Sequence, residues 1–163
     1  MKRPNSSMQL TRAADYAVRV MIQLTEPDSE RISLPALARA TGAPNSFLSK
    51  VLQALARAGF ITSRRGQAGG FRATARGRAA SMLEVIEAID GEINLNICLV
   101  SGRGCARKTH CAAHPVWVRA QHAMLEVLSS ASIEEMAAPP RAALPVRRAC
   151  GVRSERPHPR PPR

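Results

Sequence analysis

Two helical patterns joined by a tight turn and followed by a glycine-rich hairpin constrain the fold of this chain more than any other feature. Residues 34–41 and 45–58 place apolar side chains at helical spacing on either side of an Ala-Pro turn. Two strand-like stretches, residues 60–63 and 71–74, then flank a loop rich in glycine. Helix, turn, helix and hairpin in this order predict a winged helix-turn-helix domain.

The rest of the chain also carries helical patterns. Further helices are expected over residues 10–24, 82–90, 115–128 and 133–137, and the predicted N-cap residues are Thr11, Ser33, either Asn45 or Ser46, Ser81 and Ser132. Aromatic residues make up 3% of the chain, so small and aliphatic side chains must fill the interior, which favours helix packed on helix. The predicted fold class is mainly α, with a small β-hairpin as the wing.

The chain is strongly basic, and its positive charge is concentrated in one block. The formal net charge is +12. Seven cations and no acid lie between Asn45 and Ala80, namely Lys50, Arg57, Arg64, Arg65, Arg72, Arg76 and Arg78. A solvated protein surface normally mixes both signs of charge, so a one-sign block in a winged helix indicates contact with DNA phosphates. A winged helix that docks a protein partner is the alternative.

Side chains near the start of the second helix of such a motif read the edges of bases. The residues at these positions are Asn45, Ser46, Ser49 and Lys50, whose donors and acceptors suit bases or phosphates. Phe47 is expected in the buried stripe of the same helix. Arg64 and Arg65 flank the tip of the wing, from which they could reach along a minor groove.

Cys98, Cys105, Cys111 and His114 form the second informative motif. Six residues separate the first two cysteines, five separate the next two, and two precede the histidine. Structural zinc sites usually bring cysteines in close pairs, about two to four residues apart. The wider, even spacing here suits a loop around an iron–sulfur cluster. A mononuclear zinc site and a thiol redox switch remain the alternatives.

The fourth ligand of such a cluster has two candidates. His114 is close to the last cysteine in sequence, whereas Asp15 is remote and is expected on the apolar side of the first helix. In a dimer Asp15 could reach the cluster of the neighbouring subunit; otherwise it is an ordinary acid in the first turn of a helix. His110 adjoins Cys111, so both could hardly bind with good geometry, and it is interpreted as a solvated loop residue.

Composition also bounds location and partners. No apolar stretch approaches the roughly 20 residues of a membrane span, and the basic start lacks the apolar region of a secretory signal. We therefore expect a cytoplasmic protein with reduced thiols and no membrane partner. No nucleophile elbow or phosphate-cradling loop is found, so neither an enzyme nor a small-molecule substrate is expected. From Arg141 to Arg163, seven arginines and one acid predict a disordered basic tail, in which Cys150 is expected to be a free thiol.

Several stretches carry a joint family resemblance: Met8-Gln9-Leu10-Thr11, Asp15-Tyr16-Ala17, Arg65-Gly66-Gln67-Ala68-Gly69-Gly70-Phe71, Glu84-Val85-Ile86 leading to Asp90, and Cys111-Ala112-Ala113-His114-Pro115-Val116-Trp117. Together they make the chain, from about Met8 to Ala137, similar to the IscR/NsrR family of iron–sulfur winged-helix regulators (the Rrf-two family). Each motif alone would be weak, but jointly they are specific.

The resemblance implies a homodimeric transcription regulator in which the long helix from Pro115 is a dimerisation helix. It also implies an iron–sulfur cluster whose state sets the affinity for promoter DNA, with the 2Fe–2S type favoured and the 4Fe–4S type as the other option. The IscR-like branch uses a histidine three residues after the last cysteine, here His114. The NsrR-like branch uses an aspartate in the first helix, which looks like Asp15. The first cysteine gap is one residue longer than in either branch.

Family DNA contacts map onto Ser46, Phe47 and Arg65, and Gln67 of the wing is added to the expected DNA-binding residues. Ser49 stands where IscR-like proteins place a base-discriminating glutamate, so the operator preference is expected to differ. The predicted organisation is a DNA-binding domain at residues 8–91, a cysteine-rich cluster-binding loop at 92–114, a dimerisation helix region at 115–138 and the tail at 139–163.

The predicted function is that of a promoter-binding regulator, acting as a repressor, that senses nitric oxide, redox state or iron–sulfur status. Two alternatives stay open: a cluster-free regulator switched by thiol oxidation, and a winged-helix module for protein interaction. DNA binding that weakens steeply with salt is expected of the cluster-controlled regulator and of the thiol-switched regulator. It is not expected of the protein-interaction module.

Overall fold

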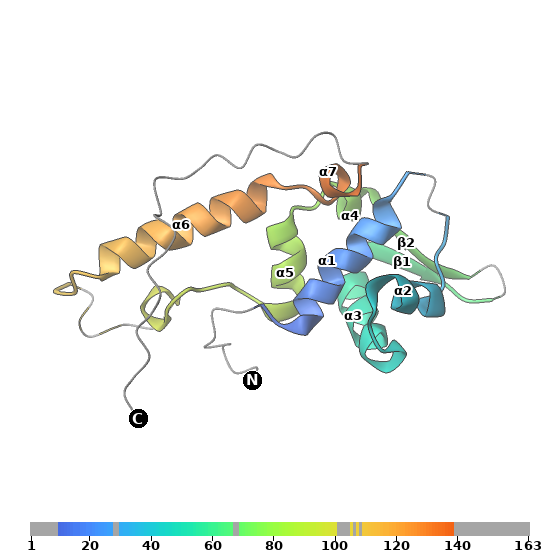
Figure 1. Ribbon diagram of the computed structural model, residues 1–163, viewed down its shortest axis with the longest axis horizontal. Helices are drawn as coiled ribbons and strands as arrows, with labels where there is room; N and C mark the ends of the chain where they lie inside the picture. Colours follow the sequence, from blue (N-terminus) through green and yellow to red (C-terminus); the bar gives the residue numbers. More distant parts are fainter. Residues whose placement is uncertain are drawn as a thin grey trace, which may run out of the picture.

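The computed structural model describes residues 10–27, 30–66, 69–100, 105, 107 and 109–138. The expectations for Gln67, Cys150 and the tail from residue 139 concern positions outside these ranges. The elements are α1 (Arg12–Thr25), α2 (Leu34–Thr41), α3 (Asn45–Arg57), β1 (Ile61–Arg64), β2 (Gly70–Ala73), α4 (Ala75–Ala79), α5 (Met82–Asp90), the short 3-10 helix η1 (Ile97–Leu99), α6 (His114–Ser130) and α7 (Ile133–Ala137). The predicted mainly helical fold with a two-stranded hairpin is confirmed (Figure 1).

Four of the predicted N-caps are present. The side chains of Thr11, Ser33, Ser81 and Ser132 each accept a hydrogen bond from a backbone N–H in the first turn of the helix that follows. Two of them also form capping boxes, in which Glu84 and Glu135 accept a hydrogen bond from the cap residue in return. These local hydrogen bonds explain why the sequence marks the starts of α1, α2, α5 and α7.

The prediction that Asn45 or Ser46 caps α3 is wrong. The helix begins at Asn45, its N-cap is Pro44, and no side chain caps it. The carbonyl oxygen of Pro44 accepts from the N–H groups of Phe47 (3.1 Å) and Leu48 (2.9 Å). The fixed φ of proline suits the extended cap position, so the helix starts one residue earlier and leaves Asn45 and Ser46 exposed.

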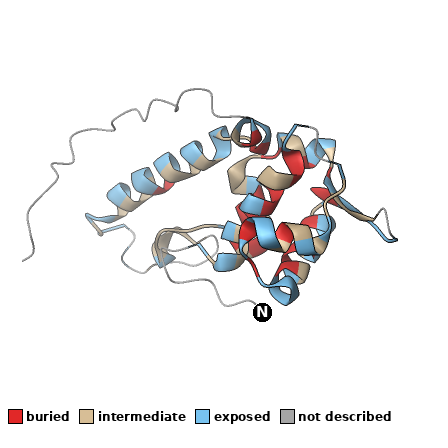
Figure 2. Cartoon of the chain, turned by 45° about the vertical axis from the view of Figure 1, so that its right-hand side comes forward, coloured by how far each residue is buried: buried red, intermediate tan, exposed pale blue. Residues whose placement is uncertain are grey.

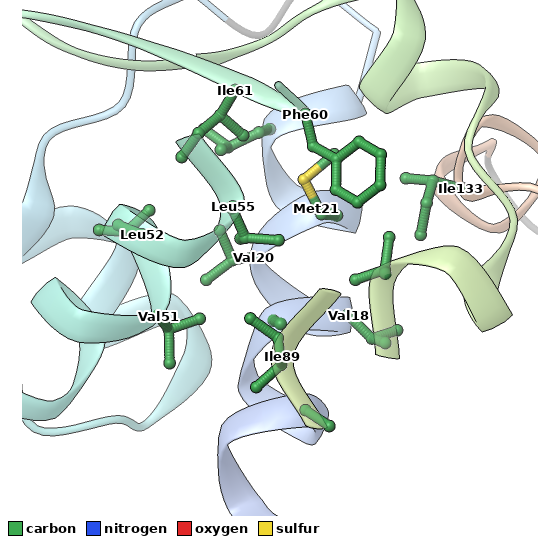
Figure 3. Packing of buried hydrophobic residues seen from close by; sticks show 14 of the residues in the cluster. Val18, Val20, Met21, Val51, Leu52, Leu55, Phe60, Ile61, Ile89 and Ile133 are labelled. Carbon is green, nitrogen blue, oxygen red and sulfur yellow. The ribbon is translucent and has the colours of Figure 1, made fainter. Parts of the chain in front are cut away.

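The hydrophobic core lies around α1, which packs against α2, α3, α5, α7 and β2. Figure 3 shows Met21 of α1 beside Leu55 of α3, Phe60 and Ile133 of α7. The largest fully buried side chains are Val20, Met21, Leu24, Leu37, Leu48, Leu52, Leu55, Val85, Ile86 and Ile133. We call α1–α5, the hairpin and α7 the winged-helix body.

The wing is an antiparallel hairpin that is anchored to the start of α2. Ile61 of β1 pairs with Ala73 of β2, and the register continues to Arg64 opposite Gly70. Ile32 adds a short bridge, with backbone hydrogen bonds to Phe71 of 3.0 and 2.9 Å. At Gly70 the φ angle is 148°, and a Cβ atom would lie 2.8 Å from the carbonyl oxygen of Ile32, so only glycine fits there.

Two short elements were not predicted, namely α4 and η1. Helix α4 begins at the N-cap Thr74, whose hydroxyl accepts from Gly77 N–H (2.9 Å) and donates to the carbonyl of Gly59 (2.8 Å). A Cβ atom at Gly77 would lie 2.0 Å from the carbonyl oxygen of Phe60, so close backbone packing requires this glycine. Elements of three to five residues are too short to show a helical period, and the N-cap Thr74 was assigned to the strand expected at residues 71–74, whereas the equally short α7 was marked by its N-cap Ser132.

Helix α6 extends from the winged-helix body like an arm (Figure 1). Most of its surface is exposed or half-buried, and Gln121 is the one buried residue of this helix (Figure 2). The C-terminal end is attached to the body, because Met82 N–H donates to Ala131 (2.8 Å) and Ile133 N–H donates to Ala80 (2.9 Å). Within the described ranges, no helix is long and apolar enough to cross a bilayer.

Candidate nucleic-acid interface and cysteine segment

The start of α3 presents a polar and aromatic surface. Asn45, Ser46 and Lys50 are exposed. The expectation that Phe47 is buried is wrong: 37% of it is exposed, and its ring meets Tyr16 of α1 edge to face at 5.7 Å. A residue in the first turn lies at the edge of the core, where packing is completed on one side only. This contact fixes the start of α3 against α1.

Ser49 is placed differently from its neighbours. Its hydroxyl donates to the carbonyl of Asn45 (3.0 Å), and the residue is half-buried. The hydroxyl proton is therefore used within the helix, although the oxygen can still accept. Ser49 is consequently less available to read bases than Asn45, Ser46 and Lys50.

The cations of the basic block lie on the same body as this surface. Lys50, Arg57, Arg64, Arg65, Arg72 and Arg76 are exposed, and Arg78 is half-buried. None of them lies within ion-pair distance of a carboxylate in the described part of the chain. Arg76 instead lies over the Phe60 ring, 5.2 Å from its centroid. The positive charge is thus free to meet phosphates.

The cysteine segment, residues 92–114, joins α5 to α6. Cys98 lies in η1, Cys105 in a loop and Cys111 just before α6; all three are half-buried free thiols. His114 is the first residue of α6, and its N–H donates to the carbonyl of Cys111 (3.0 Å). Its Nδ1 atom is buried and has no hydrogen-bond partner among the described residues. Among the described residues, no three His, Cys, Asp or Glu side chains come together as a metal-binding group.

Asp15 does not lie on the apolar side of α1, which corrects the sequence expectation. It is exposed and forms an ion pair of 3.1 Å with Arg19, one turn along the helix. The buried side of α1 is formed by residues such as Ala14, Ala17 and Val18. Asp15 is therefore an acid in the first turn, at the helix end where a negative charge is favoured. His110 is also exposed, beside Thr109.

Two polar residues join distant segments, a role that was not predicted for either of them from the sequence. Asp90, at the end of α5, accepts hydrogen bonds from the Thr11 hydroxyl (2.6 Å) and the Thr11 N–H (3.2 Å), which connects it to the start of α1. Gln121 of α6 hydrogen-bonds the backbone of Ile93 and Leu95. The only sequence signal for Gln121 was an amide side chain beside the apolar positions Trp117 and Met124.

The fold and the exposed cations define a winged-helix regulator, and comparison with known proteins agrees. Residues 10–139 match the Rrf2 family, described as an iron-dependent transcriptional regulator. The HTH-type transcriptional regulator IscR of Vibrio cholerae is 28% identical over 131 residues, which cover 79% of this chain and 75% of that protein.

Solved structures show the same fold. CymR (YrzC), the global cysteine regulator of B. subtilis, aligns with a TM-score of 0.65 at 23% identity, covering 80% of this chain and 97% of CymR. T. potens IscR aligns with a TM-score of 0.59 at 21% identity, covering 80% of this chain and 86% of IscR. The chain belongs to the Rrf2 family of transcriptional regulators, whose winged helix-turn-helix binds DNA.

Proposed function

We propose that this chain is a dimeric, promoter-binding repressor whose DNA affinity is set by an iron–sulfur cluster. Cys98, Cys105 and Cys111 would hold the cluster, with His114 or Asp15 of the partner subunit as the fourth ligand. The observation that carries the proposal is that one segment of the chain supplies three half-buried free thiols and a buried Nδ1 of His114 that has no hydrogen-bond partner among the described residues. Thiolates and imidazole are the donors that such clusters use.

The position of these donor side chains, between the winged-helix body and α6, supports a role in the control of DNA binding. The cysteine segment leaves α5 of the winged-helix body and returns into α6. A change in how this segment is arranged therefore bears on α6, and through a dimer on the distance between two reading helices. When bound, a cluster of this kind supplies reactivity toward nitric oxide or oxidants. The relationship to IscR and the iron-dependent family description support the same assignment.

The exposed face of α6 supports the dimer. Val116 and Val127 are 63% and 67% exposed, and with Ala120 and Ala123 they form a stripe at helical spacing. Small and aliphatic side chains in one row let two helices approach closely. A second copy of the same helix would cover this stripe, since most soluble oligomers are symmetric pairs.

The DNA-binding surface is the start of α3 together with the wing. In the proposed complex α3 enters a major groove, with Asn45, Ser46 and Lys50 facing bases or phosphates. Arg64 and Arg65, at the end of β1, reach the flanking minor groove. Phe47 contributes contact area at the same edge.

Anaerobic purification with iron and sulfide counting tests the cluster. We expect a coloured protein that loses its colour in the triple variant Cys98→Ala, Cys105→Ala, Cys111→Ala and keeps it in the matched control Cys150→Ala. Binding to a duplex selected from a random library should change by roughly 5- to 150-fold between loaded and cluster-free protein. A colourless protein with stoichiometric zinc, or unchanged affinity, would overturn the proposal. His114→Ala and Asp15→Ala then separate the two fourth ligands.

A second candidate is a cluster-free thiol switch. The same three thiols are unpaired, and no metal-binding group of three ligands is formed among the described residues. In that mechanism two thiols would join as a disulfide, passing two protons and two electrons to hydrogen peroxide, which becomes two molecules of water. It predicts that iron-free protein responds to peroxide in DNA binding, and that dithiol reductants reverse the response. The cluster mechanism predicts no such response without iron.

A further inference from the structure

Gln121 is a buried amide on an otherwise apolar and half-buried side of α6. It is 9% exposed, and both ends of its amide group are used. Its Oε1 accepts from the N–H of Leu95 at 2.9 Å, and its Nε2 donates to the carbonyl oxygen of Ile93 at 2.5 Å. Burying an amide is costly unless its polar atoms are hydrogen-bonded, so this residue joins α6 to the residue 93–95 backbone specifically.

The contact joins two parts of the chain that are far apart in sequence. Ile93 and Leu95 lie at the start of the cysteine segment, just before Cys98, whereas Gln121 lies two turns into the helix that follows the segment. Figure 1 shows the chain after α5 running alongside α6. The two hydrogen bonds therefore close a loop that contains all three cysteines.

The opposite end of α6 is attached in another way. Backbone hydrogen bonds from Met82 to Ala131 and from Ile133 to Ala80 join it to the winged-helix body. Ile133 is fully buried, which fixes this attachment within the core. Helix α6 is thus attached to the body at its C-terminal part, where it also packs against α5, and to the cysteine segment through Gln121.

We propose that Gln121 is the positioning residue that transmits the state of the cysteine segment to α6. The inference rests on the proposed function, because it requires that this segment controls DNA affinity. A rearrangement at residues 93–95 moves the partner groups of the Gln121 amide and so changes the tilt of α6 about its fixed C-terminal end. Without the amide, the segment can rearrange while α6 stays where the body holds it.

The test compares wild-type protein with Gln121→Met, which keeps the length of the side chain but removes the donor and the acceptor. Gln23→Met is the matched control, because the Gln23 amide hydrogen-bonds Glu26 at the same end of α1 and joins no distant segment within the described part of the chain. For each protein, Kd for the selected duplex is measured in the cluster-loaded and cluster-free states. The ratio of the two values is the coupling. Iron content and hydrogen exchange of the Leu95 amide are measured in parallel.

For wild type and Gln23→Met we expect a coupling of at least about fivefold. For Gln121→Met we expect a coupling within about twofold of unity, unchanged iron content and faster exchange at Leu95. Coupling in Gln121→Met equal to wild type overturns the inference while leaving the proposed function intact. Coupling of unity in wild type overturns both.

A purely structural role would weaken DNA binding in both states by the same factor and leave the ratio unchanged, which also overturns the inference. Gln121→Glu keeps the experiment decisive if the methionine variant does not fold. Its carboxylate can still accept from Leu95 N–H but cannot donate to Ile93. Intermediate coupling in this variant supports the proposal, and full coupling contradicts it.

Discussion

The winged-helix body and α6 differ in the side chains that they bury. The body encloses aliphatic side chains from α1, α2, α3, α5 and α7, many of them with no exposed surface, whereas α6 buries the single amide of Gln121. Fully burying one leucine or isoleucine stabilises a fold by about 1.5–3 kcal/mol. The body therefore has its own source of stability, and α6 has an apolar stripe that is open to a covering surface. The main source of stability and the proposed element of control therefore lie in different parts of one chain.

The largest expected effect tests the body. Leu55 of α3 is fully buried in the core beside Met21 (Figure 3). Leu55→Ala should lower the free energy of unfolding by about 2–5 kcal/mol, because it removes buried methyl groups and leaves a cavity. Chemical denaturation followed by circular dichroism measures this value. Gln53→Ala, at an exposed position of the same helix, should change stability by less than about 0.5 kcal/mol. Equal effects at the two positions would contradict the packing described for the body.

The same contrast explains what could be predicted from the sequence. Ser33 and Ser81 mark helix starts through hydrogen bonds within one turn, so their signal is local and the bounds of α2 and α5 match the expectation. The wing was predictable because two short strand-like stretches on either side of a glycine-rich loop are typical of a β-hairpin. The start of α3 was misplaced because Asn45 and Ser46, which are both good capping residues, follow Pro44, and the N-cap position is taken by Pro44.

The sequence identifies the candidate ligands of the cysteine segment but not how they are arranged. The three thiols and His114 are visible as a motif, yet their setting depends on contacts between residues far apart in sequence. Gln121 and Ile93 are separated by 28 positions, and no periodicity connects them. Asp15 shows the same limit, since a shift of one residue around a helix decides whether a carboxylate faces the core or the solvent.

The second prediction tests whether α6 needs a partner. Val127→Glu places a charge in the exposed apolar stripe and should weaken dimerisation by about a hundredfold or more, since an unpaired charge would be buried in each copy. Sedimentation equilibrium measures the dimer constant. Ser129→Glu adds the same charge to α6 away from the stripe and should leave the dimer intact. The unfolding of the winged-helix body should be unaffected in both variants, and a loss of body stability would break the comparison.

The third prediction separates binding from stability within the body itself. Lys50 is exposed on α3, so Lys50→Ala should leave the unfolding free energy within about 0.5 kcal/mol of wild type. Its affinity for the selected duplex should fall about tenfold, and the slope of log K against log salt should drop by about 0.9 for each phosphate that the variant no longer neutralises. Fluorescence anisotropy over a salt series measures both. Arg12→Ala removes an exposed cation outside the basic block and should change neither.

The smallest expected effect concerns the joint between the two regions. Ser81 and Ser132, the caps of α5 and α7, face each other in an isolated bridge where α6 returns to the body. The Glu84 carboxylate accepts from the Ser81 N–H (2.8 Å) and the Ser81 hydroxyl (3.0 Å). These two hydrogen bonds lower the pKa of Glu84 below its ordinary value of 4.5; burial opposes them, and the charge of Arg76 adds to the lowering.

Because the pKa of Glu84 is lower in the folded protein, its contribution to stability is complete above the ordinary pKa and is lost as the pH falls through the lowered one. Between about pH 5 and pH 3, wild type should therefore lose a few tenths of a kcal/mol more stability than Glu84→Gln, a small value because the group is exposed and screened. Denaturation curves at several pH values measure the difference. Glu87→Gln removes a charge from the same helix away from the capping box, and its stability should follow wild type over this range. If the stability of Glu84→Gln changed with pH as that of wild type does, the Glu84 carboxylate would not stabilise the body where α6 joins it.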